Sequence, residues 1–177
     1  AGSSASFTIV YSPVVAGAVN YSVTVVSDAS NGNQTAKVIA DPYSVNELRI
    51  VSTSGYCDSI VDVNIKVNNM DAITGFQLCI KMPSALQYQT NGFELSSRKT
   101  DHVGMASMRN DTLVLVAYSP TNSSFIGDDG VIASFKVKIK GTSGNHYLYP
   151  KKVILTDAQA HNVMSGSYSG YVSVSSP

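Results

Sequence analysis

Apolar and polar residues alternate with a period of two along almost the whole chain, and this pattern constrains the fold more than any other feature. Such alternation places apolar side chains on one face of an extended strand and polar side chains on the other. No stretch combines an apolar stripe of helical period with helix-capping residues. We therefore predict ten strands, at residues 6–12, 19–27, 34–40, 46–51, 59–68, 75–82, 112–118, 131–140, 147–155 and 170–174.

Turn-forming residues separate the predicted strands at regular intervals, as in residues 28–33 and 141–145. Many short strands with such spacing are typical of a β-sandwich or barrel. Asp41-Pro42 predicts a domain boundary, because proline cannot donate to a strand ladder. We expect one unit at residues 1–44 and a second at 45–177. Three strands cannot cover their own apolar face, so the first unit is expected to be part of a larger domain or to pack on the second unit.

The charge balance argues against a nucleic-acid partner. Lys+Arg and Asp+Glu both number 12, so the formal net charge is zero and nothing steers the chain towards phosphate backbones. Charged residues make up only 14%, which fits an extracellular β protein or simply a polar, uncharged surface. No apolar run approaches the roughly 20 residues of a membrane span. The first residues resemble no signal peptide, and we interpret them as a processed or engineered terminus.

The two cysteines, Cys57 and Cys79, are expected to stay unpaired. In the predicted strand at 75–82 the core set is Phe76, Leu78, Ile80 and Met82, so Cys79 points the opposite way. Cys57 shares the phase of the core residues in the next predicted strand. Two cysteines are also too few for a structural zinc site, which normally takes four ligands.

Residues 61–88, VDVNIKVNNMDAITGFQLCIKMPSALQY, form a distinctive strand-turn-strand unit that ends in proline and an apolar residue. Residues 112–127, TLVLVAYSPTNSSFIG, and 127–141, GDDGVIASFKVKIKG, each add an alternating strand with its loop. Residues 151–163, KKVILTDAQAHNV, complete the set. In order and spacing these segments resemble bacterial cohesin domains, over about residues 45–177.

The cohesin resemblance implies a jelly-roll sandwich of about nine strands without catalytic activity. It further implies a secreted or cell-surface module of a bacterial protein that binds calcium-loaded dockerin modules. The chain contains no D-x-[DN]-x-[DN]-G loop, so it would be the cohesin side of such a pair.

The beginning of the chain resembles a different family. Residues 7–40, FTIVYSPVVAGAVNYSVTVVSDASNGNQTAKVIA, are similar to the C-terminal part of an immunoglobulin-like domain of the ASPM/SPD-2/Hydin type. The S-P-x-x-A-G turn and the later S-D-A-S-N-G segment carry this likeness. It implies a partial immunoglobulin-like β segment ahead of the sandwich.

Apolar residues where a half-buried strand should be polar indicate a protein-binding surface. The run at 113–116 is continuously apolar, so one pair, Val114 and Val116, points away from the core. On strand 75–82 the outward set is Gln77, Cys79 and Lys81. In a cohesin these two strands lie side by side on the partner-binding sheet. We expect the five residues to bind the protein partner, unless residues 1–44 or a loop cover them.

Two further functions remain open. Ten tyrosines and no tryptophan admit a carbohydrate-binding module of a surface glycan-utilisation protein, with Tyr88, Tyr118, Tyr147 and Tyr149 as a stacking platform. Tyrosine is also an ordinary strand residue. The third candidate is a structural spacer in a surface protein, in which the sandwich only sets distance.

No residue pattern predicts catalysis, a metal site or a cofactor. The three histidines, His102, His146 and His161, lie in turn-like segments without ligand spacing and are interpreted as surface residues. Asp128-Asp129-Gly130 is interpreted as a tight turn and not as a calcium or glycosidase site. The lysines of strand 131–140, Lys136, Lys138 and Lys140, are expected on its solvent face.

Overall fold

A computed structural model describes Thr8, residues 19–26, Ser30, and residues 32–40 and 45–175. Contacts divide the chain into two compact units, residues 1–43 and 44–177. Among the described residues there is no helix, so the prediction of an all-β chain is confirmed. It follows that these residues also hold no helix long and apolar enough to cross a membrane.

The described part of the first unit is an antiparallel hairpin of β1 (Val19–Val25) and β2 (Gln34–Ala40). Thr24 lies opposite Thr35, with their Oγ1 atoms 3.0 Å apart. Both strands agree with the alternation in the sequence. The predicted strand at 6–12 and the Asp41-Pro42 boundary lie outside the described residues, and the immunoglobulin-like identity stays a prediction.

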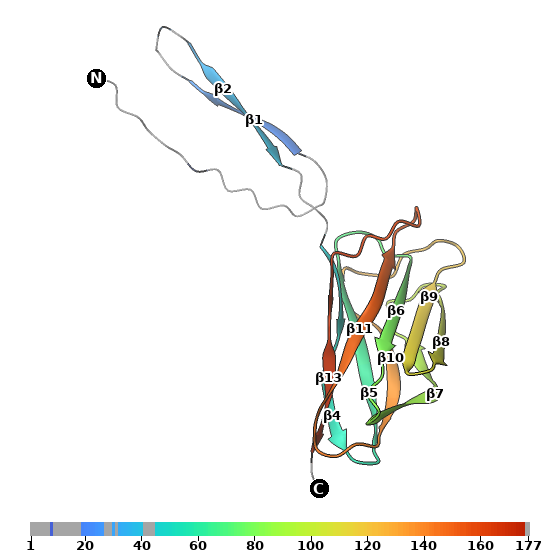
Figure 1. Cartoon of the computed structure of the whole chain (residues 1–177). Coiled ribbons are helices and arrows are strands. Elements are labelled where there is room, and N and C mark those ends of the chain that lie inside the picture. The colour runs from blue at the N-terminus through green and yellow to red at the C-terminus, as the bar shows by residue number, and fades with distance from the viewer. Residues whose placement is uncertain (1–7, 9–18, 27–29, 31, 41–44, 176–177) are drawn as a thin grey trace. The chain divides into compact units, whose positions relative to one another are not determined.

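The second unit is a sandwich of two sheets, drawn from turquoise to red in Figure 1. Strands β3, β5, β10 and β7 follow one another across the first sheet, and the short β12 pairs in parallel with β3. We call it the five-stranded sheet. Its members are β3 (Asn46–Ile50), β5 (Ile60–Asn69), β7 (Leu86–Leu95), β10 (Asp129–Ile139) and β12 (Gly166–Tyr168).

The facing layer is a six-stranded sheet in the order β4-β13-β11-β6-β9-β8. The long strand β11 joins its two halves, since its first part pairs with β13 and its second part with β6. The members are β4 (Thr53–Tyr56), β6 (Gly75–Lys81), β8 (Val103–Arg109), β9 (Thr112–Tyr118), β11 (Gly144–Thr156) and β13 (Gly170–Ser175).

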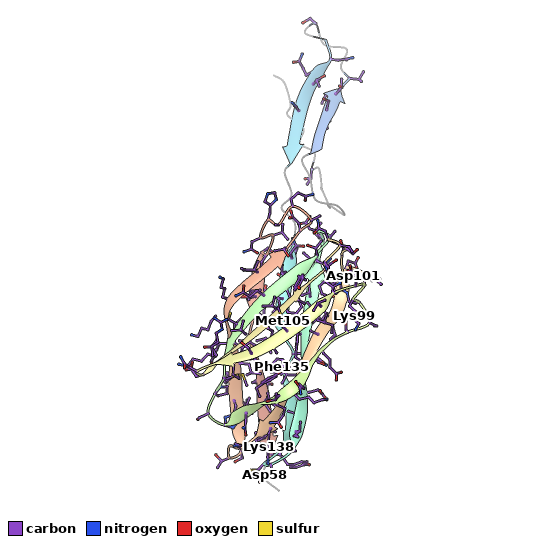
Figure 2. All side chains as sticks on the ribbon, turned by 90° about the vertical axis from the view of Figure 1, so that its right-hand side faces the viewer. Asp58, Lys99, Asp101, Met105, Phe135 and Lys138 are labelled. Atoms are coloured by element: carbon purple, nitrogen blue, oxygen red, sulfur yellow. The ribbon has the colours of Figure 1, made fainter. Side chains whose placement is uncertain are left out.

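The core lies between the two sheets and is built by the inward set of every second residue. Phe135 of β10, Leu78 of β6 and Leu115 of β9 are each fully buried. Figure 2 shows Phe135 inside the sandwich. Burying a side chain of this size contributes about 2 kcal/mol or more relative to exposure. The core set predicted for strand 75–82 is buried throughout: Phe76, Leu78, Ile80 and Met82.

Four of the observed strands have no counterpart among the ten predicted ones: β4, β7, β8 and β12. β7 contains Gln87, Gln89 and Asn91, and β8 contains glycine, alanine and methionine, so neither shows strong strand propensity. β3 and β4 are separated only by Val51-Ser52, and β12 and β13 only by Ser169. Counting each pair as one strand that crosses between sheets gives the expected nine.

Candidate functional site

The outer face of the six-stranded sheet presents two rows of side chains that cross four strands, β11, β6, β9 and β8. Strand register sets both rows, because residues directly opposite each other share one face. We call them the central rows. The first is Ile154, Gln77, Val116, Met105, and the second is Lys152, Cys79, Val114, Ser107.

The central rows are largely apolar and contain no carboxylate. Met105 is 54% exposed, and Val114 and Val116 are half-buried. Beside them lies a shallow hollow of about 470 Å3 lined by Met105, Val114, Val116 and neighbouring atoms of β8. Exposed apolar surface of this kind, where few charges must lose their water, is typical of protein-binding sites.

The outer face of the five-stranded sheet is different in kind. Lys136 Nζ lies 2.7 Å from Asp62 Oδ1, and Lys66 Nζ lies 2.9 Å from Asp129 Oδ2. Lys138 reaches Asp58 at 3.5 Å, and Figure 2 shows this pair at one end of the sandwich. The lysines of β10 thus pair with acids of the β5 strand and its preceding turn. The outer face of the five-stranded sheet is therefore a solvated charged surface. The central rows, on the other outer face, are the better candidate for a protein-binding site.

The five residues predicted to bind a partner are brought together by the β6–β9 register. Gln77 lies opposite Val116 and Cys79 opposite Val114. Lys81 sits at the margin, opposite Thr112, where its Nζ lies 3.5 Å from Asp111 Oδ2. Within the face, Gln77 Nε2 donates to Cys79 Sγ at 3.5 Å. Whether the five residues bind a partner remains a proposal.

Sequence reasoning missed four members of the central rows. Met105 and Ser107 belong to β8, which was not predicted as a strand. Lys152 and Ile154 belong to β11, and the pairing of that strand with β6 has a register shift between Pro150 and Lys152. The shift changes which residues face outward, so alternation read from the start of the strand gives the wrong phase there.

The four tyrosines considered as a platform do not lie together. Tyr88, on β7, is paired with Val137 and packs against the core, where burial raises its pKa. Tyr118 is exposed on β9. Tyr147 and Tyr149 are neighbours on β11 with ring centroids 5.7 Å apart, and Tyr171 of β13 adds a third ring 5.6 Å from Tyr147. A smaller cluster therefore replaces the predicted platform.

Histidine and cysteine positions correct two expectations. His102 is buried, with 7% of its surface exposed, although Lys99, Thr100 and Asp101 before it are polar. Cys57 does not share the core phase: it is exposed in the turn after β4, where Asp58 has a positive φ of 64°. That turn resets the alternation before β5 begins. Both cysteines are free thiols.

The expected tight turn at 128–130 is shorter than predicted, because β10 already begins at Asp129 and pairs with β5 from there. Asp128 accepts a hydrogen bond from the backbone N–H of Asn69 at 2.7 Å through its carbonyl, and Asp129 forms the ion pair with Lys66. Gly130 has a φ of 133°, which favours glycine. Within the described ranges, no three His, Cys, Asp or Glu side chains gather in a way that could hold a metal ion.

Comparison with known proteins agrees with this architecture. The sequence model of the Cohesin domain family matches residues 46–174. The chain belongs to the cohesin family. This span coincides with the second unit and its two sheets. No curated protein sequence matches the chain closely enough to add a relative.

Several solved cohesin structures share the fold. A cohesin in a type I cohesin–dockerin complex (Coh-OlpC–Doc435) from Clostridium thermocellum has a TM-score of 0.66 at 17% identity, covering 77% of this chain and 96% of its own. The sixth cohesin of Acetivibrio cellulolyticus scaffoldin B, in complex with a Cel5 dockerin mutant, has a TM-score of 0.64 at 17% identity, with 74% and 99% covered. A non-cellulosomal cohesin from the archaeon Archaeoglobus fulgidus has a TM-score of 0.61 at 14% identity, with 76% and 92% covered. The expected jelly-roll sandwich is thereby confirmed.

Proposed function

We propose that this cohesin module is a non-catalytic binding module that holds a dockerin-like protein against the central rows. One observation carries the proposal: the central part of the six-stranded sheet's outer face is apolar and free of carboxylates, whereas the opposite face is covered by ion pairs. Two of the similar cohesin structures are complexes with dockerins, which supports this class of partner.

The physical reason is the cost of desolvation. Burying Val114, Val116 and Met105 under a partner releases water from apolar surface at little electrostatic cost. Gln77 supplies a hydrogen-bonding group within this patch, and Lys152 and Lys81 at its edge offer cations to acidic groups of the partner. The rigid, paired strands β6 and β9 present these groups with little loss of conformational entropy.

Calcium in this proposal belongs to the partner. Dockerin loops would need the ion to fold, and the ion's ligands would come from the dockerin side. We also propose a secreted or cell-surface location, which follows from family membership. Fractionation of the source cells tests the location separately from binding.

The test measures binding of purified dockerin modules from the source organism by isothermal titration calorimetry, in calcium and in chelator. Val116→Asp places a charge in the middle of the central rows. The matched control, Asn64→Asp, adds a charge to the exposed outer face of the five-stranded sheet. We expect the first variant to weaken binding about thirtyfold or more, since burying an unpaired carboxylate costs about 2 kcal/mol or more.

The control is expected to bind like wild type, and chelator should abolish binding in both proteins. If no dockerin binds wild type, or if Val116→Asp binds as tightly as Asn64→Asp, the proposal is wrong. A structural spacer or a sugar-binding module would then remain as candidate functions.

A second candidate function rests on the tyrosines of β11 and β13. Tyr147 and Tyr149 are 46% and 52% exposed, and Tyr171 lies beside them. The ring planes of Tyr147 and Tyr149 are 17° apart at 5.7 Å, a stacked arrangement that shields part of each ring. The cluster would hold one sugar ring and not a glycan chain. Affinity electrophoresis in soluble polysaccharides tests it, with retardation expected for wild type and lost in Tyr149→Ala.

A further inference from the structure

Strand β8 is an edge strand without the devices that normally protect an edge. Within residues 45–175 the sheets end at β12, β7, β4 and β8. β12 and β4 span three and four residues, and the pairing of β7 with β10 contains a register shift. β8 has seven residues, pairs with β9 without a shift, and carries no charge before Arg109. A long, regular, uncharged edge is a template for pairing with another strand.

The hydrogen-bond pattern shows which groups of β8 face the open edge. Met82 N–H donates to the Asp111 carbonyl at 2.8 Å, so alternate residues of β9, from Asp111 onward, direct their backbone groups towards β6. The intervening residues, which include Val114 and Val116, bond to β8. On β8 their partners are Ser107 and Met105. The backbone groups of Gly104, Ala106 and Met108 must therefore point outward, away from β9.

The side chains around this edge are apolar and exposed. Val103, Met105 and Met108 are 43%, 54% and 42% exposed. Beside Gly104 lies a hollow of about 350 Å3, lined by Phe93 and Leu95 together with the polar side chains of Glu94, Lys99 and His102. Figure 2 shows Met105 on the strand at the front of the sandwich. The unpaired edge of β8 and the hollow next to it thus form one continuous surface that also includes the end of β7.

We propose that two copies of this chain pair through β8, antiparallel and centred on Ala106, to join their six-stranded sheets into one. This register aligns the outward-facing backbone groups of both copies over the greatest length. Ala106 then lies opposite Ala106 of the second copy, and Gly104 opposite its Met108. Each such pair exchanges two N–H···O=C bonds. The two-fold axis is perpendicular to the sheet, so both sets of central rows face the same side.

Complementarity of shape and charge favours a second copy as the occupant. Opposite residues share a face, so Met108 of one copy enters the hollow beside Gly104 of the other, against Phe93 and Leu95. On the outer face, Arg109 of one copy lies diagonal to Asp101 of the other, a pairing of opposite charges. The formal net charge of zero adds no long-range repulsion.

The test is sedimentation equilibrium of the full 177-residue chain over a range of concentrations. We expect wild type to dimerise reversibly. Met108→Lys places a charge in the hollow of the second copy, and Ala106→Pro removes an outward N–H while sparing the β8–β9 bonds. Each is expected to raise the dimer dissociation constant tenfold or more, or about 1.4 kcal/mol. Circular dichroism checks that both variants fold.

Ile60→Lys is the matched control, because Ile60 is 55% exposed on β5, an inner strand of the five-stranded sheet. It should dimerise like wild type. A wild type that stays monomeric at the highest soluble concentration overturns the proposal, as does a dimer that both β8 variants leave unchanged.

Disulfide crosslinking tests the proposed register of the β8–β8 pairing separately. In the proposed register, Met105 of one copy lies opposite Ser107 of the second copy. Their Cα atoms would then be separated by a distance that suits a disulfide. In a Cys57→Ser background, a mixture of Met105→Cys and Ser107→Cys chains should form the mixed disulfide dimer in preference to either homodimer. A mixed dimer present only at its statistical share, which in an equal mixture is twice that of each homodimer, would contradict the register.

Discussion

The ring of His102 stacks on the ring of Phe125, with centroids 3.7 Å apart and planes 25° apart. Its Nδ1 accepts a hydrogen bond from the backbone N–H of Thr100 at 3.2 Å, which requires an unprotonated Nδ1. Burial lowers the pKa of His102 below its usual 6.5, and the nearby Asp101 carboxylate only partly opposes this shift. The hydrogen bond and the burial both favour the neutral form of His102 in the folded protein.

This burial predicts a loss of stability in mild acid. Below pH 6.5 the unfolded chain gains a proton on His102 that the folded chain still excludes, so the free energy of unfolding falls as pH drops towards the lowered pKa. Above pH 6.5 the contribution is complete and constant. The slope from this one group is at most about 1.4 kcal/mol per pH unit. Urea denaturation at about pH 7.5 and about pH 5.5, on either side of the ordinary histidine pKa, measures it.

His102→Gln should flatten the pH dependence between these two values, whereas His146→Gln should keep it. Identical pH profiles for wild type and His102→Gln would show that burial of His102 has no effect on stability.

A second prediction concerns Asp101 and the hydroxyl groups around it. Ser119 Oγ donates to Oδ1 of Asp101 at 2.6 Å and Thr121 Oγ1 donates to Oδ2 at 2.5 Å. These bonds, that from Ser119 first, lower the pKa of Asp101 to about 2. The ionised form is favoured in the folded chain, so its stabilisation is complete above pH 3.8 and is lost as pH falls through about 2.

Carboxyl chemical shifts followed by NMR during acid titration give the pKa of Asp101 directly. Ser119→Ala removes the strongest of these hydrogen bonds and should raise that pKa towards 3.8. Ser134→Ala, on the other sheet, should leave it unchanged. A pKa that does not move in Ser119→Ala would contradict the assigned cause.

Arg98 connects three segments through its guanidinium group, and its loss should destabilise the sandwich. The group donates to the carbonyls of Ile126, Gly127, Val67 and Gly130 and to Asn69 Oδ1, at 2.6 to 3.2 Å. Arg98→Met would leave these acceptors without their donors, at a cost of about 2–3 kcal/mol. The change in unfolding free energy by urea titration measures it.

Arg109→Met is the matched control, because Arg109 is exposed at the end of β8 and its side chain donates none of the hydrogen bonds resolved in the described part of the chain. Its cost should stay within about 0.5 kcal/mol. Equal losses in both variants would mean that the Arg98 contacts contribute nothing specific.

At Gly170, the first residue of β13, there is no room for a side chain. A Cβ atom there would press on the Ile50 carbonyl oxygen, closer than non-bonded atoms approach. Because this oxygen belongs to the backbone of a neighbouring strand, it cannot move without disturbing β3. Gly170→Ala should therefore lower the unfolding midpoint by several degrees, about 1–3 kcal/mol.

Gly166→Ala gives the comparison, since the nearest atom to its Cβ would be the Tyr168 hydroxyl oxygen at 3.4 Å. Thermal unfolding should show little change for this variant. If Gly170→Ala is as stable as Gly166→Ala, then Gly170 does not lie as close to the Ile50 carbonyl oxygen as this structure shows.

Most strands of the sandwich were predictable because their alternation is strong. β9 was predicted at its observed bounds, and β5, β6, β10 and β13 within two residues at each end. β8 was missed because Gly104, Ala106 and Met108 carry little strand preference. β8 is extended because it pairs with β9, and this pairing cannot be predicted from the sequence of β8 alone.

The sequence by itself determined the phase of each strong strand, because side-chain direction alternates residue by residue: Leu78 had to face the core once Gln77 faced out. Only the tertiary structure decided which outward residues meet, since register joins Gln77 to Val116 across strands far apart in the chain. It alone made β8 an open edge and buried His102 against Phe125. Those features depend on contacts between distant segments, which local patterns of polarity do not encode.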